Sequence, residues 1–397
     1  MDAPTRTQVA IVGAGPAGLM LSHLLHREGI DSIVVDDRSR PDIEATIRAG
    51  ILENGTVDLL VESGASDRVL IDGHRHDGIE LQFEGEGHRI DFRDLVGRSV
   101  WLYPQHEVLK DLLARRFADG GDIRLECTAQ QVVDENTDEP RVVGVDAAGQ
   151  RFEIVADFVI GADGSRSIVR SAVSESRTGY FREYPFAWFG ILCTAPPSAS
   201  ELIYANSESG FALISQRSET VQRMYLQCDP DLDPQAMTDA EIWDALQSRV
   251  AGTELKQGEI FQRDVLRFRS FVAQRLQNRR VLLIGDAAHT VPPTGAKGMN
   301  LAIHDVQILL RGIVEYYAGR GTAVVDDYER TALRRIWRAQ NFSWWMTSML
   351  HVSAESTEFD RRRQLGELES IVSSRAAQTY LAEGYTGWPA EEEEEAR

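Results

Sequence analysis

The chain has 397 residues, with 42 Lys and Arg residues against 62 Asp and Glu residues and a formal net charge of −20. This length can hold about two or three domains. The acidic balance argues against nucleic acid as the main partner, because nucleic acid is itself polyanionic. An anionic substrate would need local positive charge at its site.

The sequence predicts neither a membrane span nor an export signal. No apolar run reaches the length that spans a bilayer, and residues 1–7 do not form a signal peptide. Cys127, Cys193 and Cys228 are widely spaced and odd in number, which indicates neither a disulfide framework nor a metal site. We therefore expect a cytoplasmic protein that binds no metal.

The N-terminal segment reads as a strand, a glycine turn, a helix and a second strand. An apolar strand at residues 8–12 runs into the glycine turn of residues 13–18, and residues 33–35 form a second strand that ends at Asp36. Here Gly13 makes the turn, Gly15 admits a pyrophosphate at a helix N-terminus, and Gly18 lets the helix pack. A tight turn without a ligand is the alternative. The complete context favours a dinucleotide site, with Asp36 on a ribose.

Two later segments hold candidate cofactor contacts. Arg48 follows the second strand and is either a solvated surface charge or a contact to a cofactor phosphate, with the two interpretations about even. Asp163 follows the apolar strand at residues 158–160. An Asp-Gly pair in that place is normally a turn. Its likeness to the first unit indicates a second cofactor contact.

Alternating apolar and polar residues predict antiparallel strands at residues 73–92. His74 and His76 lie there at a spacing that places both on one side of a strand. No third ligand is near, so we do not expect a metal site.

Short alternating strands also dominate residues 180–268 and predict a second antiparallel sheet. Alternation places Arg223 with Tyr225, and Ser215 with Arg217, on common faces. Together with Tyr204 these polar side chains could converge on one ligand. On these residues alone a solvated outer sheet face is the slightly simpler interpretation.

A long loop at residues 285–300 follows the apolar strand of residues 281–284 and precedes a helix. It contains three glycines and two consecutive prolines, and it leads into a helix N-terminus where free N–H groups gather. Such a loop adds no core, so a role in ligand binding is the better explanation.

The C-terminal part, residues 302–382, is predicted to be helical. Aromatic residues such as Trp337 and Trp344 indicate helix packing or a dimer surface. Residues 384–389 are predicted to be non-helical, and residues 391–395 to be a disordered acidic tail.

Taken together, these segments resemble the class A flavoprotein aromatic hydroxylases. The resemblance runs almost end to end and is carried by residues 8–18, 47–50, 201–206, 210–213, 215–218, 285–300 and 342–348. The Ser-Gln-Arg-Ser segment at residues 215–218 and the loop at residues 292–298 are the specific parts, whereas the glycine turn is shared widely.

The resemblance implies an α/β (α+β) fold in several parts. The expected divisions are a Rossmann-like FAD-binding domain (1–179, with strands of 73–100 on the substrate side), an antiparallel substrate domain (180–268), a return to the FAD domain with the flavin loop (269–318, loop 285–300), a helical C-terminal or interface region (319–390) and an acidic tail (391–397).

The resemblance also implies a cofactor and a set of contacts to it. FAD is expected to be held by Gly13, Gly15, Ala17, Gly18, Asp36, Arg48, Gln105, Asp163, Asp286, Pro293, Gly298, Met299 and Asn300. The dipole of the helix that follows the loop would favour negative charge on the flavin.

The implied reaction converts 4-hydroxybenzoate to 3,4-dihydroxybenzoate with O₂ and NADH or NADPH, through a flavin C4a-hydroperoxide, in a homodimer. Substrate binding falls to Tyr204, Ser215, Arg217, Arg223 and Tyr225, and catalysis to Tyr204, Tyr385, His76 and Pro293. In this interpretation Tyr204 and Tyr385 move the phenol proton, and His76 ends the path at its wet end. Arg217 pairs with the carboxylate in a planar geometry.

The nicotinamide would bind transiently, because the only complete dinucleotide unit is used by FAD. Candidate contacts are Asp37, Arg38, Arg166 and Arg269. An acid at position 37 would repel a 2′-phosphate, so NADH is expected to serve at least as well as NADPH.

Three alternatives remain at this stage. One is a related hydroxylase for 3-hydroxybenzoate or an aminobenzoate, another is a flavin-binding protein without hydroxylase activity, and the third is a pyridine-nucleotide dehydrogenase.

Overall fold

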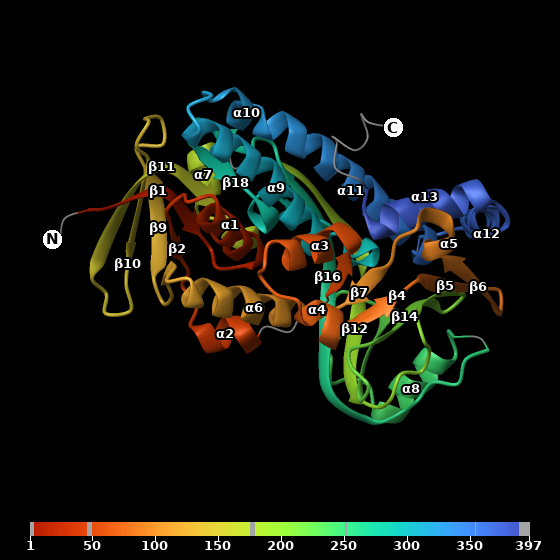
Figure 1. The fold of residues 1–397 in the computed structure, drawn as a ribbon. Helices are drawn as coiled ribbons and strands as arrows, with labels where there is room; N and C mark the ends of the chain where they lie inside the picture. The colour runs from red at the N-terminus through yellow and green to blue at the C-terminus, as the bar shows by residue number, and fades with distance from the viewer. Residues whose placement is uncertain (1–3, 46–49, 175–178, 251, 354, 389–397) are drawn as a thin grey trace.

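A computed structural model describes residues 4–45, 50–174, 179–250, 252–353 and 355–388. A first sheet carries the dinucleotide unit (Figure 1), and its strands run in the order β17 (Gln277–Asn278), β18 (Val281–Leu283), β11 (Arg151–Gly161), β1 (Thr5–Val12), β2 (Ser32–Val35) and β8 (Asp122–Arg124). A side branch of β9 (Thr128–Val133) and β10 (Arg141–Val145) pairs antiparallel with β11.

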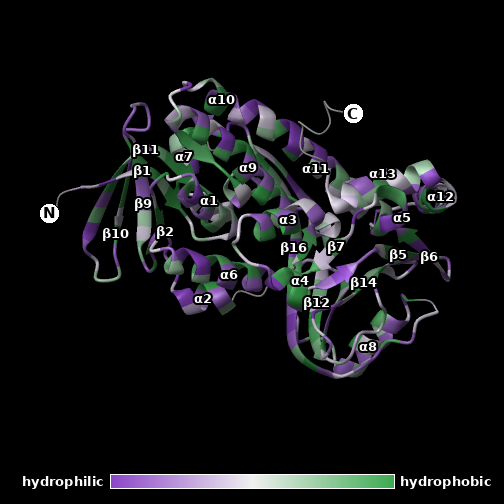
Figure 2. Ribbon diagram, in the orientation of Figure 1, coloured by the Kyte–Doolittle hydropathy of each residue, from purple (hydrophilic) through white to green (hydrophobic). Residues whose placement is uncertain are grey.

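The central strands of this sheet are parallel, so their carboxyl ends meet at one edge. In register, Val12 lies opposite Gly161 on one side and opposite Val35 on the other. The helices of this region are α1 (Pro16–Arg27), α2 (Arg40–Ala45), α6 (Gln105–Ala118), α7 (Arg170–Val173) and α9 (Gly298–Tyr317). Figure 2 shows hydrophobic residues concentrated on the central strands, where both faces are covered.

A second, mainly antiparallel sheet follows the order β19 (His289–Thr290), β16 (Glu259–Ala273), β12 (Gly179–Thr194), β15 (Val221–Cys228), β14 (Gly210–Gln216), β13 (Leu202–Ser207), β5 (Gly78–Phe83) and β6 (Glu86–Asp91). One face packs apolar residues such as Phe189 and Met224 against α8 (Asp239–Gln247), which contributes Ile242 to the same cluster. The opposite face carries Tyr204 and Tyr225 and joins the main core.

A small third sheet of β3 (Ile51–Glu53), β7 (Val100–Leu102) and β4 (His74–His76) joins the two parts. Short helices accompany it, namely α3 (Asn54–Glu62), α4 (Arg68–Asp72) and α5 (Phe92–Val96). The strands predicted within residues 73–92 are therefore confirmed, and they divide between two sheets.

The C-terminal region consists of α10 (Ala323–Asp326), α11 (Tyr328–Leu350), α12 (Glu358–Ser373) and α13 (Arg375–Thr386). The prediction that residues 384–386 are non-helical is wrong, because α13 continues through Thr386. Its residues Leu381, Ala382 and Tyr385 are buried and recur on one helical face, so packing maintains the helix until Gly387, at φ +96°. No helix among the described residues is both long and apolar enough to cross a bilayer.

Candidate active site

The carboxyl edge of the first sheet forms a narrow backbone cradle. Gly13, at φ +111°, follows β1, and a Cβ there would lie 2.3 Å from the carbonyl oxygen of Ala162. A Cβ on Gly18 would lie 2.0 Å from the oxygen of Gly13. No side chain caps the N-terminus of α1, where Gly15 is the N-cap. The free amides there fit a pyrophosphate.

Asp36 lies at the end of β2 and is buried. Its Oδ2 accepts from the amide of Ala14 at 2.6 Å and from Arg38 Nη2 at 2.8 Å, and its Oδ1 accepts from Arg38 Nε at 2.9 Å. Asp37 beside it is exposed. The acid lies at the strand end where the ribose contact is expected, and Arg38 is held against it.

Asp163 follows β11 on the same edge. Its Oδ2 accepts from the amide of Ile168 at 2.7 Å, whereas its Oδ1 is buried and has no hydrogen-bond partner among the described residues. Burial raises the pKa of this carboxyl. A buried acceptor without a partner is costly unless a ligand completes it, so Asp163 fits a hydroxyl or amide of FAD.

Asp286 begins the late loop in the short helix η2 (Gly285–Ala287). The loop is fixed from behind by Asp305, whose Oδ2 accepts from the amide of Gly285 at 2.8 Å and lies 2.6 Å from His289 Nε2. Burial disfavours the charged ring of His289, but the carboxylate of Asp305 outweighs it and raises the pKa of His289.

Arg170 joins the two acid-bearing loops, and sequence reasoning missed it. Its Nε donates to the carbonyl of Ala287 at 2.9 Å, its Nη2 lies 3.3 Å from the oxygen of Ser165, and its guanidinium stacks 4.5 Å from the ring of Phe271. A lone arginine at the start of a short helix carries no signal in the sequence that would have identified this role.

The loop narrows into η3 (Pro293–Gly295) before α9 begins at Gly298. Asn300 fixes the end of the loop: its Oδ1 accepts from Glu53 N and Thr56 Oγ1, and its Nδ2 donates to the carbonyls of Ile51 and Ala296. All four hydrogen-bonding positions of this side chain are filled by protein. A cofactor contact at Asn300 would therefore come from its backbone.

The polar side chains of the second sheet share one face. Tyr204 lies opposite Leu213, which lies opposite Tyr225, and the pair Ser215 and Arg223 is two residues further along the strands. Tyr204 is 1% exposed, and Tyr225 and Arg223 are each 4% exposed. The interpretation as a solvated outer face is therefore wrong, because this side contacts the flavin loop at Thr294 and the C-terminal helices at Leu350 and Tyr385.

Two guanidinium groups in this face have unfilled donors. Arg217 Nε and Arg223 Nε and Nη1 are buried without a hydrogen-bond partner among the described residues, while Arg223 Nη2 donates to Asp264 at 2.8 Å. Burial lowers the pKa of Arg217. Buried, unfilled cationic donors match an anion such as a carboxylate. The hydroxyl of Ser215 donates to the carbonyl of Arg223 at 2.7 Å and keeps lone pairs for a ligand.

Tyr204 and Tyr385 form a buried hydroxyl pair, with their oxygens 2.6 Å apart. The oxygen of Thr294, in the flavin loop, lies 3.4 Å from the Tyr204 hydroxyl. Burial raises the pKa of each of the two tyrosines above the ordinary value for a tyrosine. Both hydroxyls therefore stay neutral and can pass a proton without a buried charge.

His76 is 1% exposed, and neither ring nitrogen has a partner among the described residues. The expectation that its ring lies at a wet end is therefore wrong. It sits on β4, paired opposite Val100 of β7, and its side chain is buried. Burial lowers the pKa of His76 to about 4.

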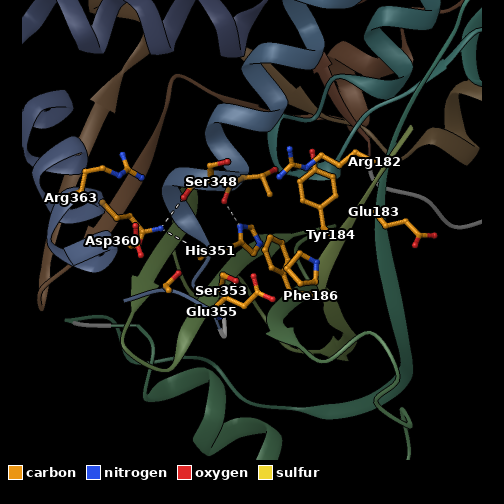
Figure 3. A pocket seen from close by; sticks show the side chains of 14 residues that line it. Arg182, Glu183, Tyr184, Phe186, Ser348, His351, Ser353, Glu355, Asp360 and Arg363 are labelled. Atoms are coloured by element: carbon orange, nitrogen blue, oxygen red, sulfur yellow. Dashed lines mark hydrogen bonds between the residues drawn. The ribbon is translucent and has the colours of Figure 1, made fainter. Parts of the chain in front are cut away.

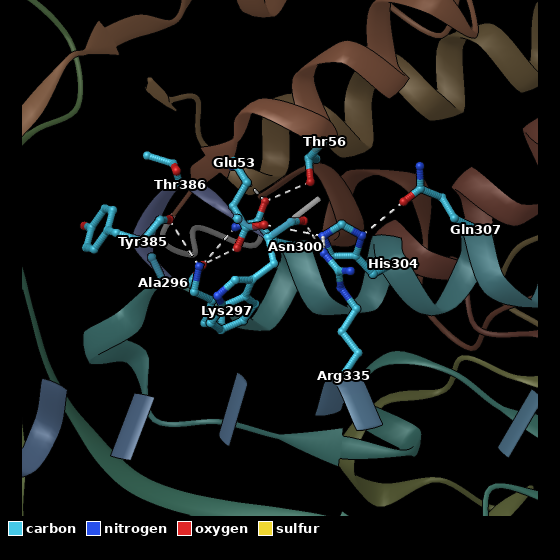
Figure 4. Close-up of polar contacts among 12 residues, drawn as sticks. Glu53, Thr56, Ala296, Lys297, Asn300, His304, Gln307, Arg335, Tyr385 and Thr386 are labelled. Carbon is cyan, nitrogen blue, oxygen red and sulfur yellow. Dashed lines mark hydrogen bonds and ion pairs between the residues drawn. The ribbon is translucent and has the colours of Figure 1, made fainter. Parts of the chain in front are cut away.

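Behind the flavin loop, a buried ion pair joins Lys297 to Glu53 (Figure 4), with Nζ 2.5 Å from Oε1. Lys297 also donates to the carbonyl of Tyr385 at 3.1 Å. Burial would raise the pKa of Glu53, but the charge of Lys297 and the bond to His304 hold it at about 2. Lys297 belongs to the loop motif, but a lysine between glycines is equally typical of an exposed surface charge. The sequence therefore did not predict this ion pair.

The remaining predicted residues are spread over several elements. Arg48 lies outside the described residues. Gln105 opens α6. Of the nicotinamide candidates, Arg269 donates to Ser165 Oγ at 2.8 Å beside exposed Arg166, whereas Asp37 and Arg38 lie at the end of β2. The four candidates therefore lie at two different places, Arg166 with Arg269 and Asp37 with Arg38.

These features agree with the comparisons with known proteins. The family described as FAD binding domain matches residues 6–343, and the chain belongs to it as a flavin-dependent aromatic monooxygenase. FAD is therefore its cofactor, and the cradle at Gly13 and the unfilled acceptor of Asp163 fit it.

Within that family the chain is similar to p-hydroxybenzoate hydroxylase of Acinetobacter baylyi, with 39% identity over 391 residues, covering 97% of this chain and 96% of the other. It is 29% identical to a 3-(3-hydroxy-phenyl)propionate/3-hydroxycinnamic acid hydroxylase of Burkholderia vietnamiensis, over 83% of this chain and 61% of that protein. Its fold resembles that of p-nitrophenol 4-monooxygenase from Pseudomonas putida DLL-E4, at TM-score 0.83 and 19% identity, over 98% of this chain and all of the other.

Proposed function

We propose that this enzyme hydroxylates 4-hydroxybenzoate to 3,4-dihydroxybenzoate, using O₂ and a reduced nicotinamide. One observation carries the proposal: buried arginines with unfilled donors share a sheet face with the Tyr204–Tyr385 hydroxyl pair. The similarity to p-hydroxybenzoate hydroxylase over 97% of the chain supports the same assignment.

The spacing on this face suits a para-substituted benzoate. Tyr204 and Tyr225 lie at one level across the strands, and Ser215 and Arg223 lie two residues further along them. Two residues correspond to a distance of about 7 Å along a strand. The carboxylate would lie at Ser215, Arg217 and Arg223, and the phenol at Tyr204. This arrangement also supplies the positive charge that an anion needs in a chain of net charge −20.

FAD, when bound, would accept a hydride from the nicotinamide and activate O₂. The residues that would hold it are the turn at Gly13, with Asp36, Asp163 and Asp286. The protein's own part is to orient the aromatic ring against the Pro293 end of the flavin loop and to exclude water from it.

An electron-rich ring requires an ionised phenol at the moment of attack. A free phenol of the tyrosine type has a pKa of about 10, so a fall of about 2–3 units needs about 3–4 kcal/mol of differential stabilisation. We infer that Tyr204 takes the phenol proton and Tyr385 passes it on. His76, which is buried and neutral at physiological pH, is proposed as the next acceptor.

A panel of benzoates tests the substrate. We expect 4-hydroxybenzoate to stimulate NAD(P)H oxidation and to yield 3,4-dihydroxybenzoate, with 3-hydroxybenzoate and aminobenzoates giving little product. Turnover of one of the other acids with 4-hydroxybenzoate inert would overturn the assignment. Peroxide release without product would favour a protein that binds flavin but does not hydroxylate.

NADH is proposed to serve at least as well as NADPH. Asp37 is exposed beside the ribose acid, and Arg38 is held by Asp36 rather than free for a 2′-phosphate. Steady-state kcat/KM values for the two nucleotides with 4-hydroxybenzoate present test this. A preference of tenfold or more for NADPH would contradict it.

A homodimer is proposed through the aromatic surface around α11. Trp337, Trp344 and Phe359 are 44%, 42% and 75% exposed, and Tyr180 and Phe181 on β12 are 56% and 59% exposed. Next to Phe181 and Phe359 in the chain, Arg182 and Asp360 line a cavity of about 650 Å³ (Figure 3). Its lining carries both charge signs, with Arg363, Glu183 and Glu355 as further charged residues. A surface with both signs can pair with a copy of itself across a twofold axis.

Light scattering tests this surface with Phe359→Glu and, as a control on another face, Ile71→Glu at a side chain that is 73% exposed on α4. We expect the first variant alone to become monomeric. An unchanged dimer in both variants, or a monomeric native protein, would reject the surface.

The three cysteines are unpaired, which supports a reducing compartment such as the cytoplasm.

A further inference from the structure

His304 stands beside the Lys297–Glu53 ion pair, and its ring nitrogen Nε2 has two competing neighbours (Figure 4). Nε2 lies 3.0 Å from Arg335 Nη2 on α11 and 3.4 Å from Glu53 Oε2 at the end of β3. A guanidinium can only donate and a carboxylate can only accept. One nitrogen therefore cannot satisfy both neighbours in the same protonation state.

The other nitrogen decides which state fits each neighbour. His304 Nδ1 lies 3.1 Å from Gln307 Oε1. In the neutral ring Nδ1–H donates to Gln307, and Nε2 accepts from Arg335. In the protonated ring Nε2–H donates to Glu53, and Arg335 keeps its bond to the carbonyl of Trp388 at 2.7 Å.

The cluster lies one contact away from the proposed proton path. Lys297 Nζ bonds both to Glu53 and to the carbonyl of Tyr385, whose hydroxyl pairs with Tyr204. The charged groups that face His304 are Glu53 from β3, Lys297 before α9, and Arg335 from α11; Arg338 stacks on Trp388 nearby, 4.5 Å from its ring. A proton on His304 adds positive charge to this set.

We propose that His304 is a positioning residue that sets the electrostatic field at Tyr385 and the flavin loop, pairing with Arg335 when neutral and with Glu53 when protonated. The added charge favours an ionised phenol and negative charge on the flavin. The part that concerns the phenol rests on the proposed substrate. The part that concerns the flavin does not.

Two substitutions fix the two states. His304→Asn cannot be protonated and leaves Arg335 its bond to the carbonyl of Trp388, and His304→Lys carries a permanent charge toward Glu53. The phenol of bound 4-hydroxybenzoate is titrated by its ultraviolet absorbance, without nicotinamide. We expect the midpoint in His304→Lys to lie below that in His304→Asn by at least about half a pH unit.

A second readout separates this proposal from the substrate assignment. The midpoint reduction potential of bound FAD, measured without aromatic acid, should be higher in His304→Lys than in His304→Asn. Flavin content and circular dichroism confirm that each variant is folded, and His26→Gln, at an exposed histidine of α1, should match the native protein.

The outcomes are distinct. If no benzoate binds but the potentials differ, the substrate assignment fails and the role of His304 stands. If the two variants share one potential and one titration curve, the proposal for His304 is overturned.

Discussion

The hydroxyl oxygens of Tyr204 and Tyr385 lie 2.6 Å apart, although 181 residues separate them in the chain. Tyr204 comes from β13 and Tyr385 from α13, and the ring of Tyr385 stacks on Phe92 of α5 at 5.1 Å. The pair is buried beneath the flavin loop. The proposed proton path therefore depends on segments that meet only in the folded protein.

Tyr204→Phe removes the first hydroxyl of this pair while keeping the ring. We expect substrate to bind and NAD(P)H oxidation to remain stimulated, while the yield of hydroxylated product falls by about a hundredfold, as for a lost acid–base group. Product and peroxide are measured against nucleotide consumed. Unchanged coupling would remove Tyr204 from the proton path.

Arg217→Ala removes one of the buried guanidinium groups. Loss of a charge-assisted bond should weaken 4-hydroxybenzoate binding by about 2–3 kcal/mol, or about thirtyfold or more in Kd. Quenching of flavin fluorescence gives the Kd. Arg267→Ala, at a side chain that is 68% exposed on β16 of the same sheet, is the control and should leave the Kd unchanged. Equal effects in the two variants would mean that overall charge, not a built site, attracts the acid.

Lys297→Leu leaves the carboxylate of Glu53 buried without its cation. Breaking a buried pair on one side typically costs about 3–5 kcal/mol, so we expect a large fall in the free energy of unfolding. The double variant Lys297→Leu with Glu53→Gln should recover much of it, because no unpaired charge remains. Urea unfolding of the three proteins measures this. A double variant no more stable than Lys297→Leu would contradict the ion-pair account.

The same pair predicts a dependence on pH. The pKa of Glu53 is about 2 in the folded protein against an ordinary value of 4.5. Its contribution is therefore fully present above pH 4.5 and is lost as the pH falls toward 2. Glu53→Gln should flatten the unfolding free energy over this range. Parallel curves for the two proteins would show that Glu53 is not held ionised.

The burial of His76 predicts a second loss of stability, at a higher pH than the loss due to Glu53. Its pKa is about 4 when folded against an ordinary value of 6.5, so folding favours the neutral ring. Stability should be complete above pH 6.5 and decline as the pH falls toward 4. His76→Gln should remove this decline, whereas His26→Gln should retain it. Thermal unfolding between pH 4 and 7 measures the difference, and an unaltered slope in His76→Gln would place the titration elsewhere.

Gly13→Ala places a methyl group 2.3 Å from the carbonyl oxygen of Ala162, at a backbone φ of +111°. We expect this variant to lose bound FAD, because the turn cannot keep its shape. Gly55→Ala, where nothing lies within 4 Å of the added carbon, should purify with full flavin. Absorbance of the purified proteins gives the FAD content. Full flavin in Gly13→Ala would show that this turn does not shape the cofactor site.

The sequence by itself determined the local units. The glycine turn, the acid at Asp36, the alternating strands around Tyr204 and the late loop could be predicted because each depends on spacing within a few residues. Tertiary structure decided which face of the second sheet is buried, that α13 continues through Tyr385, and that His76 is enclosed. It also placed Glu53 beside Lys297, 244 residues apart, and Arg170 between two loops. These contacts depend on packing between distant segments, and short-range periodicity carries no information about such packing.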